Sequence, residues 1–380
     1  MSEVTYDVIV AGLGGMGSQI AMELARRGRK VLGLDRHRPP HGWGSSHGQS
    51  RIIRQAYFEH PLYVPLVMRS YQKWRALESD SGKSLLTITG GLMLGEADST
   101  LVRGARQSAE LHHLPFDVLD SAAIRWRFPA IRPGPETVGL FEPEAGVLQP
   151  ERAIEAALGL ALRAGATFRF DQPMLDWKPT DGHFLVATPA GACRAEQLVL
   201  AAGPWMPDLL GPSWPLEVER QVMFWFDPVA HPEHFARSAM PVWIWEWQTG
   251  QYHYGFPDLG DGIKVARHHG GVRGALNSLS AQVSDEEIRE MRHWLAQHLP
   301  GANGPLRSTV VCRYTDAPDD HFVVGPHPDH PGVTIVSPCS GHGFKFAAVI
   351  GEVVADLVMG QTSPFDLTPF APSRLLRRSG

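Results

Sequence analysis

A glycine-rich turn near the start of the chain carries the strongest chemical signal in the sequence. Residues 6–11 form a short apolar run, residues 12–17 read Gly-Leu-Gly-Gly-Met-Gly, residues 18–27 follow a helical pattern, and a second apolar run ends at Asp35. This order of strand, turn, helix, strand and acid is typical of a dinucleotide-binding unit. It predicts a nucleotide site, with an ordinary glycine turn as the alternative, and it does not separate FAD from NAD.

Each residue of this unit has a physical task. Gly12 permits the tight turn, Gly14 lets a pyrophosphate approach the backbone, and Gly17 lets the helix lie close to the strand. The first turn of the helix offers free N–H groups and a partial positive charge to phosphates. Asp35 would accept a hydrogen bond from a ribose hydroxyl.

Two arginines follow the loop of residues 36–50, which is rich in Gly, Pro, Ser and His. Arg51 and Arg54 lie three residues apart, so on a helical turn they would share one face. The planar guanidinium group suits a carboxylate or a phosphate. A solvated basic pair is the alternative.

A second glycine loop, Ser340 to Lys345, opens an apolar helix that runs through Leu357. Its N-terminus would face a negatively charged part of a cofactor. Three tryptophans at positions 243, 245 and 247 alternate, so in a strand they share one face. We interpret that face as packing on a neighbouring sheet rather than as a cavity wall.

The elements that position these residues interleave along the chain. Helical patterns span residues 63–77, 100–112, 150–164 and 284–298, and the last carries a capping box between Ser284 and Glu287. Short strands with turns dominate residues 85–147 and 214–266. We therefore assign residues 1–84, 148–213 and 322–372 to a discontinuous nucleotide-binding domain, residues 85–147 and 214–321 to a substrate domain, and residues 373–380 to a C-terminal tail.

Composition is that of a globular protein of 380 residues, with 43% hydrophobic residues and a net charge of -5. This charge gives no electrostatic case for binding nucleic acid or an anionic membrane. No stretch is long and apolar enough to span a membrane, and residues 1–5 lack a basic n-region, so we expect no signal peptide and a cytoplasmic location. The three cysteines form neither a disulfide framework nor a metal knuckle, and we expect no metal site.

Several stretches together carry a resemblance to a known family. They are the early glycine motif, Gly44 to Tyr57 (GSSHGQSRIIRQAY), Tyr63 to Val67, Tyr254 to Pro257, Cys312 to Tyr314 with Pro318 to Phe322, Ser340 to Phe346 (SGHGFKF), and Phe365 to Phe370. With these motifs the chain resembles the monomeric sarcosine oxidase and N-methyl-L-tryptophan oxidase family over nearly its whole length. The resemblance implies an FAD-binding Rossmann-like α/β domain of the glutathione-reductase-2 type, interleaved with an α+β substrate domain built on a mixed antiparallel sheet.

The resemblance also implies the chemistry. FAD would be joined covalently through its 8α-methyl group to Cys312, because a thiolate is the nucleophile suited to that position. Cys193 and Cys339 have no such match and we regard them as structural. The family oxidises N-methyl amino acids to an imine that hydrolyses to formaldehyde and the amino acid, with O2 reduced to hydrogen peroxide. It suggests a monomer.

The resemblance also implies roles for the residues that match functional positions of the family. Arg54 and Lys345 would hold the substrate carboxylate, with Tyr254 beside the substrate. Lys264 would promote the reaction with O2, because a fixed cation stabilises developing superoxide. The catalytic set is Lys264, His268, Arg51, Tyr254 and Tyr314. The cofactor-binding set is Gly12, Gly14, Met16, Gly17, Asp35, Ser45, Ser50, Arg51, Cys312, Gly341, Gly343, Phe344 and Lys345.

The chain also departs from the family pattern. Gln49 replaces an aspartate of the family, Asp35 is one carbon shorter than the common glutamate, and residues 242–252, which we expect to border the pocket, do not align well. An oxidase of a cyclic imino acid or a D-amino acid would need the same carboxylate clamp. A flavin- or NAD-binding redox sensor without catalysis would not need Arg54, Lys264 and Lys345, which favours an oxidase.

Overall fold

The computed structural model describes residues 5–376, and the expected tail reaches beyond them at residues 377–380. Its first sheet has eight strands, in the order β10-β11-β12-β1-β2-β9, with β20 beside β12 and β19 beside β20. These strands are β1 (Thr5–Ala11), β2 (Val31–Leu34), β9 (Thr167–Arg169), β10 (Asp176–Thr180), β11 (His183–Thr188), β12 (Gly191–Leu200), β19 (Val323–Pro326) and β20 (Val333–Ser337).

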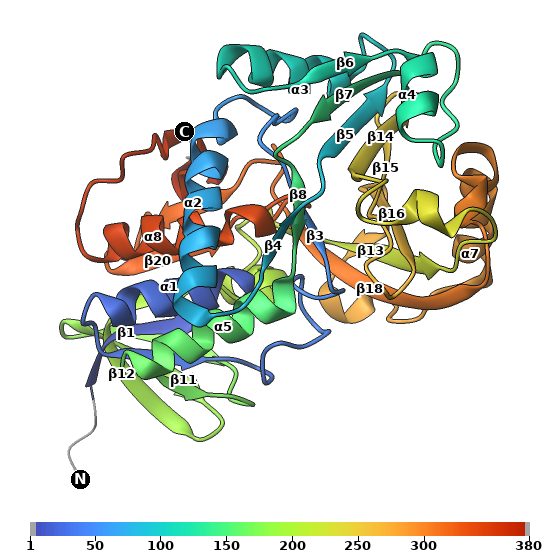
Figure 1. Cartoon of the computed structure of the whole chain (residues 1–380). Helices are drawn as coiled ribbons and strands as arrows, with labels where there is room; N and C mark the ends of the chain where they lie inside the picture. Colours follow the sequence, from blue (N-terminus) through green and yellow to red (C-terminus); the bar gives the residue numbers. More distant parts are fainter. Residues whose placement is uncertain (1–4, 377–380) are drawn as a thin grey trace.

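The centre of this sheet is parallel. β1 pairs in parallel with β2 and β12, and β12 also pairs in parallel with β20. Val8, Ile9 and Val10 are all fully buried, because both faces of a parallel sheet are covered. Helices α1 (Gly15–Arg26), α2 (Tyr63–Ser81), α5 (Pro150–Arg163) and α8 (Ala347–Val358) pack against one another beside it (Figure 1).

The second sheet has nine strands, in the order β17-β13-β16-β15-β14-β5-β7-β6, with β18 on β13. It is mainly antiparallel, and the parallel pair β14–β5 makes it mixed. Its strands are β5 (Gly91–Gly95), β6 (Asp117–Leu119), β7 (Val138–Glu142), β13 (Glu217–Phe226), β14 (Val242–Gln248), β15 (Gln251–Gly255), β16 (Ile263–His268), β17 (Arg273–Gly274) and β18 (Leu306–Asp316).

The remaining elements complete the two lobes seen in Figure 1. A small antiparallel sheet of β3 (Arg51–Ile53), β8 (Gly146–Leu148) and β4 (Leu86–Ile88) runs between them. The other helices are α3 (Thr100–Leu111), α4 (Ser121–Arg127), α6 (Met206–Leu210) and α7 (Asp285–His298). The short 3-10 helices are η1 (Gly203–Trp205), η2 (Pro232–Phe235), η3 (Leu276–Ser278), η4 (Pro300–Ala302), η5 (Phe344–Phe346), η6 (Thr368–Phe370) and η7 (Pro372–Leu375).

The expected fold class is confirmed: a Rossmann-like α/β unit is interleaved with a second unit built on a mixed sheet. The residue boundaries given above for the two domains stay a prediction. None of the helices within residues 5–376 is long and apolar enough to cross a membrane.

Two local predictions of the sequence analysis have clear outcomes. Trp243 stacks on Trp294 of α7 with ring centroids 5.6 Å apart, and Trp245 meets the same ring edge-on, so packing is confirmed, although the partner is a helix and not the expected sheet. The helical turn considered for Arg51 and Arg54 is wrong, because Arg51–Ile53 is a strand paired with β8. The β-branched pair Ile52-Ile53 favours that extended conformation.

Candidate active site

One large cavity opens at the carboxyl ends of β1, β2 and β12 and continues to the second sheet. It encloses about 1800 Å³ of space, counting its open mouth. Its wall contains the glycine turn and Asp35 at one end, and Cys312 and Lys345 at the other. The cavity therefore joins the two groups of residues that the sequence singled out separately.

The glycine turn has the geometry that its residue types require. Gly12 has φ +93°, and a Cβ there would lie 2.4 Å from the carbonyl oxygen of Ala201. A Cβ at Gly17 would overlap the carbonyl oxygen of Gly12, so only glycine lets α1 lie this close to β1. A Cβ at Gly14 would meet no atom within 4 Å, and Gly14 lines the cavity. Gly12 and Gly17 thus shape the turn, and Gly14 faces the space of a ligand.

Asp35 closes the nucleotide end at the end of β2. Its Oδ2 accepts a hydrogen bond from the backbone N–H of Leu13 at 2.7 Å, and its Oδ1 accepts one from His37 N–H at 2.9 Å. Nε2 of His41 lies 3.4 Å from Oδ1. These contacts fix the carboxylate at the cavity wall, where it can still accept a further hydrogen bond.

The residues at this end of the cavity fit the adenosine and pyrophosphate parts of FAD. The N-terminus of α1 opens on the cavity through Gly14, Gly15 and Met16, and such a helix end favours phosphate groups. The hydroxyl of Ser45 is buried at the wall and has no hydrogen-bond partner among the described residues, so it can bind a polar group of a ligand. On the opposite side Gly341, Gly343 and Phe344 of the second glycine loop line the same space.

Cys312 lies in β18 with 3% of its surface exposed. Its Sγ is 3.6 Å from Nη2 of Arg51 and 3.6 Å from the carbonyl oxygen of Ser45. Arg51 is fixed by hydrogen bonds of 2.8 Å to the carbonyl oxygens of Ser50 and Ser45. Arg51 therefore places a positive charge beside the sulfur of Cys312.

Lys264 is 2% exposed and lies behind this wall, since it does not line the cavity itself. Its Nζ donates to the carbonyl oxygens of Gly48 and Ser50, both at 2.8 Å, and to Ser50 Oγ at 3.1 Å. Burial, and then the charge of Arg51, lower the pKa of Lys264 well below its usual value. Three oxygen acceptors match the three N–H bonds of an ammonium group, so these hydrogen bonds oppose the effect of burial and stabilise the charged form.

Ser50 and Gly17 therefore have tasks other than direct contact with a ligand. Ser50 is 2% exposed and serves as an acceptor for Lys264, and neither it nor Gly17 lines the cavity. The other predicted cofactor residues do line it: Gly12, Gly14, Met16, Asp35, Ser45, Arg51, Cys312, Gly341, Gly343, Phe344 and Lys345.

Arg54 and Lys345 both line the cavity and are both buried. Arg54 forms a two-pronged pair with Glu59, with Nη2 at 2.8 Å and 2.7 Å from the two carboxylate oxygens. Nζ of Lys345 donates to the carbonyl oxygen of His342 at 2.7 Å and lies 3.4 Å from Tyr57 Oη. Burial, and then the charge of Arg54, lower the pKa of Lys345 to about 7.

Sequence reasoning missed three residues that hold these cations: Glu59, Tyr57 and His342. Nε2 of His342 lies 3.1 Å from the carbonyl oxygen of Asp320, so it carries the proton, and Nδ1 accepts from Tyr57 Oη at 2.6 Å. Burial lowers the pKa of His342 to about 3, which agrees with a neutral ring. The position of Glu59, an acid five residues after Arg54 in one loop, was the available signal.

An aromatic wall lies opposite the cations. His268, at the end of β16, has its Nδ1 3.3 Å from Tyr314 Oη, and its ring meets Tyr254 edge-on at 6.1 Å. Burial, followed by the neighbouring His269, lowers the pKa of His268 well below its usual value. Burial raises the pKa of Tyr254 to about 12. The wall therefore offers neutral hydrogen-bonding groups.

The poorly aligning segment 242–252 borders the cavity through Ile244. Its tryptophans at positions 243 and 245 point to the other side of the sheet, where they contact α7. Ile244 thus belongs to the wall beside Tyr254 and Phe256, and an aliphatic side chain there limits one edge of the space.

The sequence of this chain is similar to those of known proteins over nearly its whole length. Residues 7–357 match the family model described as DAO, FAD dependent oxidoreductase. A monomeric sarcosine oxidase of Streptomyces avermitilis is 43% identical over 376 residues, which cover 98% of this chain and 98% of that protein. An N-methyl-L-tryptophan oxidase of Salmonella heidelberg (strain SL476) is 36% identical over 373 residues, covering 97% and 99%.

The solved structure of NikD, an unusual amino acid oxidase essential for nikkomycin biosynthesis, has the same architecture in its open form. It superimposes with a TM-score of 0.85 at 25% sequence identity and covers 98% of each chain. The similarity therefore extends over both lobes and is not confined to the glycine turn.

Proposed function

We propose that this chain, which belongs to the DAO family of FAD-dependent oxidoreductases, oxidises the N-methyl group of an amino acid such as sarcosine or N-methyl-L-tryptophan. The observation that carries this proposal is the shared cavity. One continuous cavity is lined by the glycine turn at one end and by Cys312, Arg51, Arg54 and Lys345 at the other, although these residues lie far apart in the sequence.

FAD supplies the two-electron acceptor that O2 can reoxidise to give hydrogen peroxide. We infer that Cys312 holds it through a thioether to the 8α-methyl group. The place of Cys312 in the wall of the cavity, with Sγ 3.6 Å from Nη2 of Arg51, supports this role, because cysteine sulfur is the nucleophile that can form such a bond. Asp35, Gly14 and the N-terminus of α1 would hold the adenosine and pyrophosphate parts.

Arg54 and Lys345 would bind the substrate carboxylate. Within the described residues Lys345 has two protein acceptors, so one of its three N–H groups is available to a ligand. Glu59 already pairs with Arg54, so protonated Lys345 supplies the net positive charge at this wall, and little water screens its attraction for an anion. Binding the carboxylate there orients the N-methyl group toward the cofactor.

His268, Tyr254 and Tyr314 would surround the amine. A neutral imidazole with Nδ1 next to Tyr314 can accept a hydrogen bond from the amine and keep its lone pair oriented. The amine loses a hydride equivalent from the methyl carbon and a proton from nitrogen, and water then cleaves the imine to formaldehyde and the primary amino acid. O2 takes up the two electrons and two protons as hydrogen peroxide.

Lys264 would promote the reaction of the reduced flavin with O2, although it lies behind the residues that line the cavity. Its ammonium group is held rigidly by three oxygens, so it needs no reorganisation when negative charge develops on O2. We also infer a cytoplasmic monomer whose partners are the small-molecule substrate and O2, without nucleic acid or membrane.

A panel of amines assayed for hydrogen peroxide tests the proposed function. Sarcosine and N-methyl-L-tryptophan should give peroxide and formaldehyde in equal amounts, whereas glycine, proline and D-alanine should give little. Peroxide without formaldehyde from proline or D-alanine, and none from either N-methyl amino acid, would assign the enzyme to another amine.

A further inference from the structure

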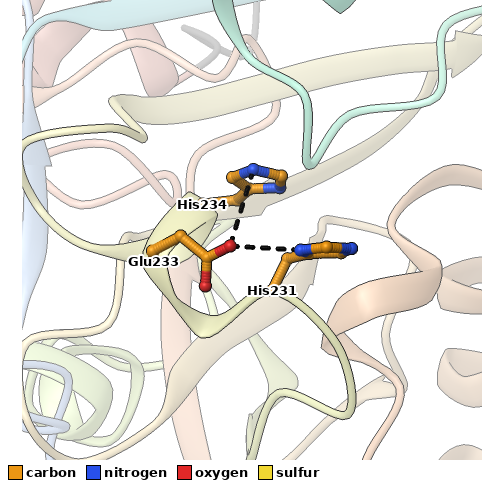
Figure 2. A group of neighbouring side chains, drawn as sticks. All are labelled: His231, Glu233 and His234. Carbon is orange, nitrogen blue, oxygen red and sulfur yellow. Dashed lines mark hydrogen bonds and ion pairs between the residues drawn. The ribbon is translucent and has the colours of Figure 1, made fainter.

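Two histidines and a glutamate gather on an exposed turn of the second lobe, at η2. Figure 2 shows one carboxylate oxygen of Glu233 directed between ring nitrogens of His231 and His234. Oε1 of Glu233 lies 3.1 Å from Nδ1 of His231 and 3.9 Å from Nε2 of His234. One potential ligand atom from each residue lies within 4.8 Å of the other two.

The turn that carries these side chains is fixed by the core. His231 adopts a left-handed backbone conformation with φ +51°, Pro232 follows it, and the N–H of His234 donates to the carbonyl oxygen of His231 at 2.9 Å. Phe235 is 1% exposed, and its carbonyl oxygen accepts from the N–H of Asp258 at 2.7 Å. The two imidazole rings lie almost parallel, with centroids 4.9 Å apart, and they can turn about their side-chain bonds to direct their nitrogens at one ion.

The set of two imidazoles and one carboxylate suits a particular class of ion. Zn²⁺, Co²⁺, Ni²⁺ and Cu²⁺ bind imidazole well, whereas Mg²⁺ and Ca²⁺ prefer oxygen ligands throughout. Zinc bonds to histidine nitrogen and carboxylate oxygen at roughly 2.0–2.2 Å, so ligand atoms on one ion lie about 3–4 Å apart. Small side-chain rotations of exposed residues achieve that spacing here, and water can fill the remaining positions.

A second cluster of the same kind, Glu219, His269 and Asp316, is a poorer candidate. Its ligand atoms are equally close, but Nη2 of Arg273 lies 3.2 Å from Oε2 of Glu219 and 3.6 Å from Oδ2 of Asp316. That guanidinium group already neutralises the carboxylates. Glu233 differs, because its ion pairs within residues 5–376 are with His231 and His234.

We propose that His231, Glu233 and His234 form a binding site for one divalent transition-metal ion, with Zn²⁺ as the reference ion. The ion replaces the hydrogen-bonded contacts of Glu233 and links the two ends of the turn. None of the three residues lines the large cavity, so the site is independent of the proposed oxidase reaction.

The test uses untagged, metal-free protein and Zn²⁺ in titration calorimetry. We expect one ion per chain, with weaker binding at lower pH because protons compete for the imidazole nitrogens. His231→Gln and His234→Gln should each weaken binding by roughly tenfold or more, since each removes a ligand. His293→Gln is the matched control, because His293 is an exposed histidine on α7 outside the cluster, and it should bind Zn²⁺ like the unaltered protein.

A Co²⁺ titration followed by visible absorption reports the ligands directly. Bands of nitrogen and oxygen coordination should appear, without the intense near-ultraviolet band of a thiolate ligand. The proposal is overturned if Zn²⁺ does not bind, or if it binds equally to His231→Gln/His234→Gln. An unchanged circular-dichroism spectrum of that double variant confirms that folding is intact, and amine oxidation should be the same with and without zinc.

Discussion

The nucleotide end and the substrate end of the cavity are built in different ways. At the nucleotide end, one continuous stretch from Gly12 to Asp35 supplies backbone N–H groups, a helix terminus and a single acid. At the substrate end, charged side chains from separate strands and loops are buried and held by carbonyl oxygens, as Lys264 and Lys345 show. A local motif is enough for the first task, whereas the second depends on the whole fold.

This difference predicts separable effects. A change in the glycine turn should affect folding and the binding of FAD together, because Gly12 and Gly17 have no room for a Cβ. Changes at the substrate end should leave the fold intact and affect one step at a time, because each cation there contacts different groups.

Replacing Cys312 should have the largest effect at the substrate end of the cavity. In Cys312→Ser the thioether cannot form, so all flavin should be released when the protein is precipitated with acid. The unaltered protein should keep its yellow colour in the pellet. Cys339→Ser is the control and should also keep it. Flavin that remains bound after acid treatment of Cys312→Ser would place the linkage elsewhere.

Lys264→Met should separate the two half-reactions. Reduction of the flavin by substrate should persist, while reoxidation by air should slow by about 10²–10³-fold, because a fixed positive charge beside the developing superoxide is lost. Stopped-flow absorbance of each half-reaction measures this. Equal slowing of both half-reactions would show that Lys264 supports the shape of the site instead.

Lys345→Met should weaken substrate binding. Loss of one charged hydrogen bond is expected to cost about 1.5–3 kcal/mol, which corresponds to a rise in KM of roughly 10- to 100-fold. The reoxidation rate should not change, because Lys345 does not contact the groups around Lys264. A normal KM would remove Lys345 from the carboxylate site.

The smallest effect concerns pH. The pKa of Lys345 is lowered to about 7, so its ammonium form is present below that value and is lost as pH rises. Binding of an unreactive carboxylate analogue should therefore weaken above pH 7, by up to about tenfold per unit. Asp316 also has a pKa of about 7, raised by burial and by Glu219, so Asp316→Asn is the control.

Lys345→Met should lose this pH dependence and Asp316→Asn should keep it. The opposite pattern would assign the dependence to the buried pair of Glu219 and Asp316.

The sequence predicts the nucleotide end well because its constraints are local. Gly17 is required by its contact with Gly12, and Asp35 is held by the N–H group of Leu13, all within one βαβ unit, so both positions can be derived from spacing. The dinucleotide-binding unit is expected from periodicity and glycine positions, whereas the mixed second sheet is implied by the resemblance to a family, and the structure confirms both.

The substrate end could not be derived in this way. By composition alone Lys264 and His268 would be exposed residues, and only the resemblance to a family placed them in a pocket. Both are buried, because β16 lies inside the second sheet between β13 and β15. Tyr57 and His342 were missed because they pair with each other from distant segments, whereas Glu59 was missed although its partner Arg54 lies five residues away in the same loop. The strand Arg51–Ile53 was missed because it is short and depends on β8.

The most direct test of the account is to add sarcosine or N-methyl-L-tryptophan to the purified protein without oxygen. The account predicts that one of them bleaches the yellow flavin completely, that air restores the colour with release of hydrogen peroxide, and that formaldehyde appears in the same amount. As a control, a chemical reductant should bleach the same flavin. If the flavin is reducible in this way but stays oxidised with both compounds, the proposal that the cavity directs an N-methyl amino acid toward FAD is contradicted.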